Sequence, residues 1–430
     1  MAGEIDRAHV RLAELVAALS LGIDLGFGQP MEHVLRQCLI SLRLAEAIGL
    51  GEEERSSVYY TALLLNVGCH SDAHEQAKWF GDDIELKSTK YDHELRSVRA
   101  AVSGLRSLGA GNPPLHRFRL GLEFALSGHR EVDHMVEHHG AIGRSLAEQL
   151  DLPEAVLDAL GAGYERWDGK GWPGDLEGEE VPIASRVAGM AEFIEVANRL
   201  GGVEAAKELA RERRGKQFDP ALSELVEREG EVILSGLDDI ATWDAVIEAE
   251  PALAVVLSGE RVDAVLLAIA NFVDLKSPYF LGHANAVAQL AAEASARLDM
   301  NDAEVRLLRR AGFVHDLGRL GVSNAIWDKR GPLGAGGVGA GPFAAVHHRA
   351  HAEAVGSARA DGGDSRPAPG AARWLGLPAG ALGRRDFPLR PCAGCRRRLP
   401  GDARAAPASP GPLARRRGRG APGRRPGRSP

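Results

Sequence analysis

Residues 283–318 read HANAVAQLAAEASARLDMNDAEVRLLRRAGFVHDLG, and residues 33–68 read HVLRQCLISLRLAEAIGLGEEERSSVYYTALLLNVG. In the earlier stretch, apolar residues recur every three or four positions, as on one face of an amphipathic helix. These residues are Val34, Leu35, Cys38, Leu39 and Leu42. Similar stripes recur along the chain up to about residue 314, whereas strand-like alternation is scarce. The sequence therefore predicts an all-α protein.

The two stretches align without a gap, which indicates an internal repeat. Each opens with a histidine and an apolar helix, passes through a polar turn and ends after a second apolar helix. His283 and His315 are 32 residues apart, the same spacing as between His33 and Leu65. The first copy therefore has Leu65-Asn66 where the second copy has a His-Asp pair.

The second copy contains the side chains suited to chemistry. His315 and Asp316 are adjacent where an apolar helix ends, and His283 comes from a separate helix. Imidazole and carboxylate donors that converge from different helices suit a divalent iron, manganese or zinc ion. Arg319, one turn further on, suits bidentate contact with phosphate oxygens. The alternative is a histidine at a helix C-terminus beside a solvated aspartate, with no ion.

The composition, with 44% hydrophobic and 26% charged residues, is typical of a globular chain with two or three domains. No run of 18 apolar residues occurs, which argues against a membrane-spanning helix, and the first residues lack an apolar signal region. Four cysteines in 430 residues cannot form a disulfide framework, so we expect a reduced, cytoplasmic protein.

The net charge of −7 is the sum over two segments of opposite charge and different composition. Residues 331–430 contain 18 arginines, no lysine and 5 acidic residues, a balance of +13, which leaves −20 for residues 1–330. The last hundred residues also contain 14 of the 23 prolines. Because such a segment buries too little apolar surface to order itself, we expect residues 333–430 to be disordered. Nucleic-acid binding by this tail is disfavoured because aromatic residues are almost absent from it.

The segments DLKSPYFLGHANAVAQLA (274–291) and AGFVHDLGRLGVSNAIWDKRGPL (311–333) resemble the first half of an HD-GYP domain. HD-GYP domains are a subclass of the HD-superfamily metal-dependent phosphohydrolases, and the resemblance covers residues 262–332. It implies that His283, His315 and Asp316 hold a divalent metal ion, and that Arg319 takes the place of a phosphate-contacting lysine. It also implies phosphodiester hydrolysis in signalling, with cyclic di-GMP as substrate and with Asp316 and Arg319 as catalytic residues.

Residues 31–225 resemble the same family but depart from it at several positions. EHHGAIGRSLAEQL (137–150) is similar to the family's HPxxG segment, and YERWDGKGWPGDLEGEEVPIASRVAGMAEF (164–193) is similar to its HHExxDGxGYP stretch. The HD doublet is replaced by Leu65-Asn66, and Glu192 stands where an aspartate is usual. The resemblance therefore implies a degenerate copy that is not expected to hydrolyse a phosphodiester. The residues that survive from the metal-binding set are His33 and His139, with Asp168 nearby.

One polar cluster in the first copy suits a relocated metal site. Cys69, His70, Asp72, His74 and Glu75 lie within seven residues, and His70 and His74 would share one face of a helix. The alternative is a polar helix start with acidic residues at a surface turn.

Two functions follow for the chain. The first is a metal-dependent phosphohydrolase of the cyclic-dinucleotide phosphodiesterase type, impaired in this chain. The alternative is a non-catalytic regulatory module whose first copy senses a nucleotide. In the family, the link WDGKGWPGDLEG (167–178) flanks the substrate pocket, so Arg166, Asp168 and Trp172 would line a ligand site. The expected partner is a phosphodiester or cyclic-dinucleotide ligand, and the prediction also allows a homodimer.

The predicted domains are a degenerate copy (1–225), a helical connector (226–261), the first half of a second copy (262–332) and the tail (333–430). Ala, Gly, Pro and Arg have GC-rich codons, as expected of a GC-rich gene read out of frame. Synonymous codons for three segments of the tail can be chosen and read from the second base of each codon. With this one shift, they permit three tracts that resemble, in order, the missing second half of the domain. They are EWERVRSQPYITERML from 337–353, HQERLDGSGYP from 368–378 and RVLAAADAYRAMREPRP from 391–407. We therefore hypothesise an extra base near codons 334–337, a frameshift.

Overall fold

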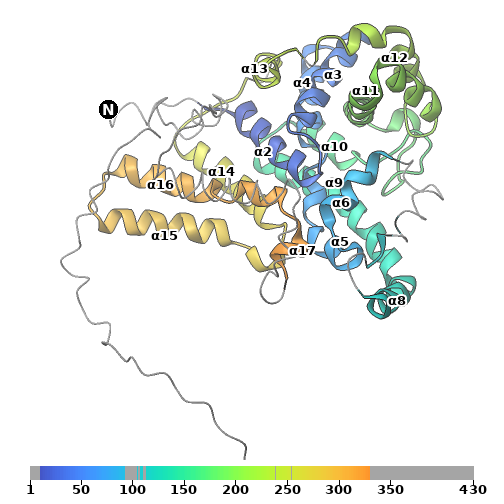
Figure 1. Cartoon of the computed structure of the whole chain (residues 1–430). Coiled ribbons are helices and arrows are strands. Elements are labelled where there is room, and N and C mark those ends of the chain that lie inside the picture. Colours follow the sequence, from blue (N-terminus) through green and yellow to red (C-terminus); the bar gives the residue numbers. More distant parts are fainter. Residues whose placement is uncertain are drawn as a thin grey trace, which may run out of the picture. The chain divides into compact units, whose positions relative to one another are not determined.

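The computed structural model describes residues 10–92, 104, 107–109, 113–237, 239–252 and 254–329. Within these ranges the secondary structure is almost entirely helical, so the expected all-α fold is confirmed (Figure 1). One short antiparallel pair, β1 (Val10–Arg11) with β2 (Val256–Leu257), is an addition that the sequence pattern did not indicate. The tail predicted to be disordered, with its shifted-frame tracts, lies outside the described residues.

The helices up to residue 237 are α2 (Leu12–Gly26), α3 (His33–Ala47), α4 (Glu52–Leu64), η1 (Val67–His70), α5 (Ala73–Phe80), α6 (Asp83–Ser88), η2 (Thr89–Tyr91), α8 (Pro114–Glu123), η3 (Phe124–Gly128), α9 (His129–Gln149), α10 (Glu154–Gly161), η4 (Gly178–Glu180), α11 (Ile183–Arg213) and α12 (Pro220–Ile233). After them come α13 (Thr242–Glu248), α14 (Glu260–Asp274), η5 (Pro278–Phe280), α15 (His283–Arg297), α16 (Asp302–Val314), η6 (Leu317–Gly321) and α17 (Asn324–Trp327). The boundary predicted at residue 225 falls within α12. In the described ranges no helix is both long and apolar enough to cross a bilayer.

The same succession of elements occurs twice in the chain. Helices α3 and α15 have 15 residues each, and α4 and α16 have 13 residues each. Both α3 and α15 follow a residue in the left-handed region, Glu32 at φ 73° and Gly282 at φ 76°. In both copies an aspartate of the preceding helix, Asp24 or Asp274, accepts a hydrogen bond from the second N–H of the next helix. These shared features show that α3 and α15 begin at equivalent positions in the two sets of helices.

Helices α15 and α16 run side by side (Figure 1). At Gly312 the two backbones approach so closely that an added Cβ would lie 2.5 Å from the Cα of Ala288. Only glycine permits this approach. The end of α16 consequently lies near the start of α15, which brings the last residues of one helix to the first residue of the other.

Buried Asp83, in the first turn of α6, joins the two copies. Its Oδ2 lies 3.1 Å from the Nζ atoms of both Lys87 and Lys276, and its Oδ1 accepts hydrogen bonds from Ser323 and Asn324. Lys276 is completely buried, and burial lowers its pKa to about 8 despite the nearby carboxylate. The hydrophobic core is also continuous through both copies. The segment that follows η6 is thus fixed to the first copy by a buried charge cluster.

Candidate active site

His283, His315 and Asp316 converge where α16 ends and α15 begins. Nε2 of His283 lies 3.3 Å and Nε2 of His315 lies 3.1 Å from Oδ2 of Asp316. One ligand atom from each residue lies within 4.8 Å of the others, and no second group of this kind occurs among the described residues. The three side chains are between 22% and 36% exposed, so an ion can reach them from solvent.

The protonation and orientation of these groups suit a cation. Nδ1 of His315 donates a hydrogen bond to the carbonyl oxygen of Gly312 at 2.8 Å, which directs its Nε2 toward Asp316. Burial opposes ionisation of Asp316, but the hydrogen bond to His315 and the charge of Arg319 outweigh it and lower the pKa of Asp316. The same hydrogen bond raises the pKa of His315. The donor set therefore attracts positive charge and fits a divalent ion.

Arg319 is buried directly beside this group. Its guanidinium contacts the carboxylate of Asp316, and its Cζ lies 3.5 Å above the ring centroid of Phe280. Its Nε and Nη1 are buried and have no hydrogen-bond partner among the described residues. Because buried N–H groups are nearly always paired, an acceptor is missing here, and phosphate oxygens suit a guanidinium. The residue predicted to contact phosphate thus lies beside the predicted metal ligands.

The first copy has different chemistry at the equivalent positions. His33 is buried, with its Nδ1 paired to the carboxylate of Glu195 and its Nε2 3.3 Å from the hydroxyl of Tyr91. Leu65, the counterpart of His315, is part of the hydrophobic core. Both ring nitrogens of His33 are therefore engaged by protein groups.

A lysine provides the positive charge in the first copy. Nζ of Lys90 lies 2.7 Å from Oε1 of Glu192 and 3.0 Å from Oδ1 of Asn66. The amide of Asn66 and the hydroxyl of Tyr91 donate to the same carboxylate oxygen, each at 2.8 Å. Burial would raise the pKa of Glu192, but Lys90 outweighs it and the pKa is lowered. An ammonium group thus lies between the side chains of Asn66 and Glu192.

His139 also has both ring nitrogens engaged. Its Nδ1 lies 3.4 Å from Sγ of Cys69, and its Nε2 pairs with the carboxylate of Asp72. All three residues are at least nine-tenths buried. His139 therefore offers no free lone pair to an ion in this arrangement.

His70 is an aromatic core residue between the two copies. Its ring stacks between Phe27 and Phe272, at centroid distances of 5.8 and 6.4 Å. A Cβ at Gly26 would lie 2.3 Å from its Nε2, so glycine is required there. Burial keeps the pKa of His70 well below its ordinary value, and the ring is neutral.

The remaining candidates of the first copy have separate partners. Nδ1 of His74 lies 2.7 Å from Oδ2 of Asp328. Asp168 accepts two hydrogen bonds from Arg166, at 2.9 and 3.0 Å. The structure therefore does not bring His70, Asp72 and His74 together around one point, as a relocated metal site would require.

Lys90 and Tyr91 were not among the residues predicted from the sequence. They belong to no recognisable motif and lie 24 residues or more beyond Asn66. The signal that could have indicated Lys90 is indirect, since a buried acidic residue without a metal ion needs a cation from elsewhere in the chain.

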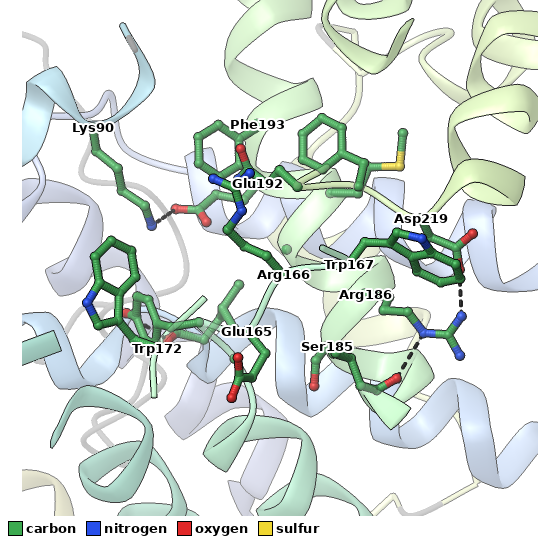
Figure 2. Close-up of a pocket in the computed structure, with 18 residues that line it drawn as sticks. Lys90, Glu165, Arg166, Trp167, Trp172, Ser185, Arg186, Glu192, Phe193 and Asp219 are labelled. Carbon is green, nitrogen blue, oxygen red and sulfur yellow. Dashed lines mark hydrogen bonds and ion pairs between the residues drawn. The ribbon is translucent and has the colours of Figure 1, made fainter. Parts of the chain in front are cut away.

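A pocket in the first copy encloses about 640 Å³ of space, part of it open to solvent (Figure 2). Its wall includes Lys90, Arg166 and Arg186, and Figure 2 shows two of them in ion pairs, Lys90 with Glu192 and Arg186 with Asp219. Of the lining residues predicted from the sequence, Arg166 and Trp172 belong to the wall, whereas Asp168 does not and instead holds Arg166. The aromatic residues of the wall are Tyr164, Trp167, Trp172, Phe193 and Phe218.

Comparison with known proteins extends over most of the chain, although no family model matches it. The chain is 31% identical over 326 residues to 3′3′-cGAMP-specific phosphodiesterase 3 of Vibrio cholerae, which is 75% of this chain and 71% of the relative. It is 25% identical over 222 residues to 3′3′-cGAMP-specific phosphodiesterase 2 of the same organism, which is 50% of this chain and 34% of that relative. A crystal structure of a cyclic GMP-AMP specific phosphodiesterase of V. cholerae superposes with a TM-score of 0.58 and 30% identity, covering 80% of each chain. The chain therefore belongs to the family of the 3′3′-cGAMP-specific phosphodiesterases.

Proposed function

We propose that this chain is a metal-dependent phosphodiesterase that hydrolyses a cyclic dinucleotide at the group formed by His283, His315 and Asp316. The observation that carries the proposal is the convergence of two imidazoles and a carboxylate beside a buried guanidinium that has two unpaired N–H groups. The names of the relatives support 3′3′-cGAMP as the substrate, in place of the cyclic di-GMP that the HD-GYP resemblance implied.

Each residue has one role in this proposal. His283, His315 and Asp316 would hold a divalent iron, manganese or zinc ion, which when bound lowers the pKa of a water molecule and polarises a phosphoryl oxygen. Arg319 would donate Nε–H and Nη1–H to the phosphate, which supplies the acceptors that these groups lack. The ring of Phe280 keeps the guanidinium in place.

We further propose that residues 1–225 form a degenerate HD copy and that residues 262–332 form only the first half of a second one. In the printed frame, residues 331–430 contain none of the motifs that complete an HD-GYP domain. The second site then lacks its fourth ligand, which the shifted tract AAADAY would supply. Hydrolysis by the chain as printed is therefore expected to be weak.

Sequencing codons 325–345 from genomic DNA, followed by assay of both readings, tests this proposal. With Mn²⁺, the frame-corrected chain should hydrolyse 3′3′-cGAMP at least about 100-fold faster than the 430-residue chain. Losing a metal ligand should lower the rate of hydrolysis at least as much as losing a residue that only orients a ligand. Loss of such an orienting residue lowers activity about 10- to 100-fold. A chelator should abolish the activity of both. Genomic reads without a surplus base would remove the frameshift hypothesis, and hydrolysis that survives the chelator would remove the metal proposal.

The first-copy pocket favours a second candidate function, the binding of a nucleotide without hydrolysis. Indole rings provide stacking surfaces for a base, and the guanidinium groups of Arg166 and Arg186, each paired with an aspartate, border the same space. Lys90 makes a metal ion unnecessary there. This copy would then sense a nucleotide for the rest of the chain.

Calorimetric titration of the 430-residue chain with 3′3′-cGAMP in the presence of a chelator tests this second function. Trp172→Ala should weaken binding at least about fivefold, since stacking on one aromatic ring contributes about 1–3 kcal/mol per base. Trp172→Phe keeps a ring and should bind nearly as the unaltered chain does. Binding that is insensitive to Trp172→Ala, or no binding at all, would argue against the pocket as a nucleotide site.

A further inference from the structure

Cys69, His139 and Asp72 form a relay of three side chains in the first copy. Sγ of Cys69 lies 3.4 Å from Nδ1 of His139, and Nε2 of the same ring pairs with Asp72. Cys69 lies in η1, His139 lies in α9, and Asp72 is the residue that precedes α5. The relay is therefore a product of the tertiary fold rather than of one local motif.

The arrangement is that of a nucleophile, a base and a group that orients the base. In a metal site the donor atoms converge on one point, whereas here the imidazole ring separates the sulfur from the carboxylate. A thiol, an imidazole and a carboxylate in this order are typical of activated cysteines. Gly68 maintains the contact, because a Cβ there would lie 2.3 Å from the carbonyl oxygen of His139.

The surroundings of the sulfur favour its reactive form. Burial disfavours a thiolate, but the charges of His139 and Lys90, together with hydrogen bonds, outweigh it and lower the pKa of Cys69. The hydroxyl of Tyr164, 2.8 Å from Sγ, is one of these hydrogen-bond partners. Burial also disfavours an imidazolium, but Cys69 and Asp72 raise the pKa of His139 to about 10.

Cys38 provides an internal contrast. Its side chain is completely buried, and its Sγ lies 3.7 Å from the carbonyl oxygen of Tyr59. Burial raises the pKa of the Cys38 thiol. The two cysteines within the described ranges therefore differ sharply in environment, although both belong to the first copy.

We propose that Cys69 is a modification site for hydrogen peroxide or another small hydroperoxide. The sulfur attacks one peroxide oxygen, the O–O bond breaks, and the thiol proton passes through His139 to the leaving oxygen. Thiol and hydrogen peroxide thus yield a sulfenic acid and water, with the sulfur oxidised by two electrons and the peroxide reduced. Cys69 is 6% exposed, which restricts the reaction to small reagents. Because Tyr164 contacts Cys69 and also lines the pocket, modification would alter the pocket wall.

Treating the folded 430-residue chain with hydrogen peroxide at pH 7, then removing the peroxide and unfolding the chain in dimedone, followed by peptide mass spectrometry, tests the proposal. Cys69 should be oxidised to the sulfenic acid at least about tenfold faster than Cys38, because even an ordinary thiol is only a few per cent ionised at this pH and burial raises the pKa of Cys38 further. Equal labelling of the two cysteines in the folded chain would overturn the proposal. This comparison needs no variant and so does not depend on how a variant folds.

Two variants separate activation from simple exposure. Asp72→Asn should slow labelling of Cys69, because the amide no longer supports a charged imidazole, whereas Cys38→Ser should leave the rate unchanged. Circular dichroism of both variants checks that the helical fold is retained. Labelling of Cys69 at an unchanged rate in a folded Asp72→Asn variant would show that the relay does not activate the thiol. Neither experiment depends on hydrolysis, so failure of the phosphodiesterase proposal would not affect this one.

Discussion

Asp316→Asn should reduce the rate of 3′3′-cGAMP hydrolysis by at least about 100-fold. Losing a metal ligand should lower the rate at least as much as losing a residue that only orients a ligand. Oδ2 of Asp316 is the atom that both His283 and His315 approach, and it also contacts Arg319. An amide has the same shape but no charge, so it cannot hold a divalent ion between the imidazoles. The measurement is the turnover rate at saturating Mn²⁺, in both the 430-residue chain and the frame-corrected chain.

A second readout distinguishes lost metal binding from lost catalysis. The variant should retain less bound manganese than the unaltered chain after gel filtration, as measured by elemental analysis. Asp244→Asn, at an exposed residue in the first turn of α13, is the matched control and should preserve both metal content and turnover. Undiminished hydrolysis by a folded Asp316→Asn variant would place the reaction elsewhere in the chain.

Lys90→Met should lower the free energy of unfolding by about 3–5 kcal/mol, as expected when one partner of a buried ion pair is removed. Methionine retains the length of the apolar stem but leaves the carboxylate of Glu192 without a cation. Asn66 and Tyr91 still donate hydrogen bonds, but neither carries charge. Urea unfolding followed by circular dichroism measures the effect.

The matched control for this substitution is Lys170→Met. Lys170 is 74% exposed and pairs with Asp168 at 3.6 Å, so its loss should change stability by no more than about 0.5 kcal/mol. The double variant Lys90→Met/Glu192→Gln should recover part of the loss, because no uncompensated charge remains. A stable Lys90→Met variant that binds one equivalent of Mn²⁺ more than the unaltered chain would show instead that the first copy accepts an ion in place of lysine.

The helices and the convergence of the second-copy side chains could be predicted because local and periodic signals determine them. The apolar stripe of α3 is visible in the sequence alone, and the constant spacing of the two copies aligns His283 with His33. The convergence of His283 with His315 follows from the antiparallel packing of α15 and α16, which a short polar turn between two apolar helices already indicates.

The first copy could not be predicted to the same depth, because its polar interior depends on long-range contacts. Lys90 reaches Glu192 across about a hundred residues of sequence, and no pattern in either segment identifies the other. The metal cluster suggested around His70 relied on helical spacing. The structure instead places that ring in an aromatic stack against Phe272, which belongs to the second copy.

The buried charge cluster at Asp83 has a consequence for how the protein evolves. Detaching the first copy would separate Lys276 from the carboxylate of Asp83 and would expose the Phe272 side of the shared apolar core to water. The two copies should therefore unfold in one cooperative transition. The first copy would therefore be retained as a folding partner of the second copy even without chemistry of its own.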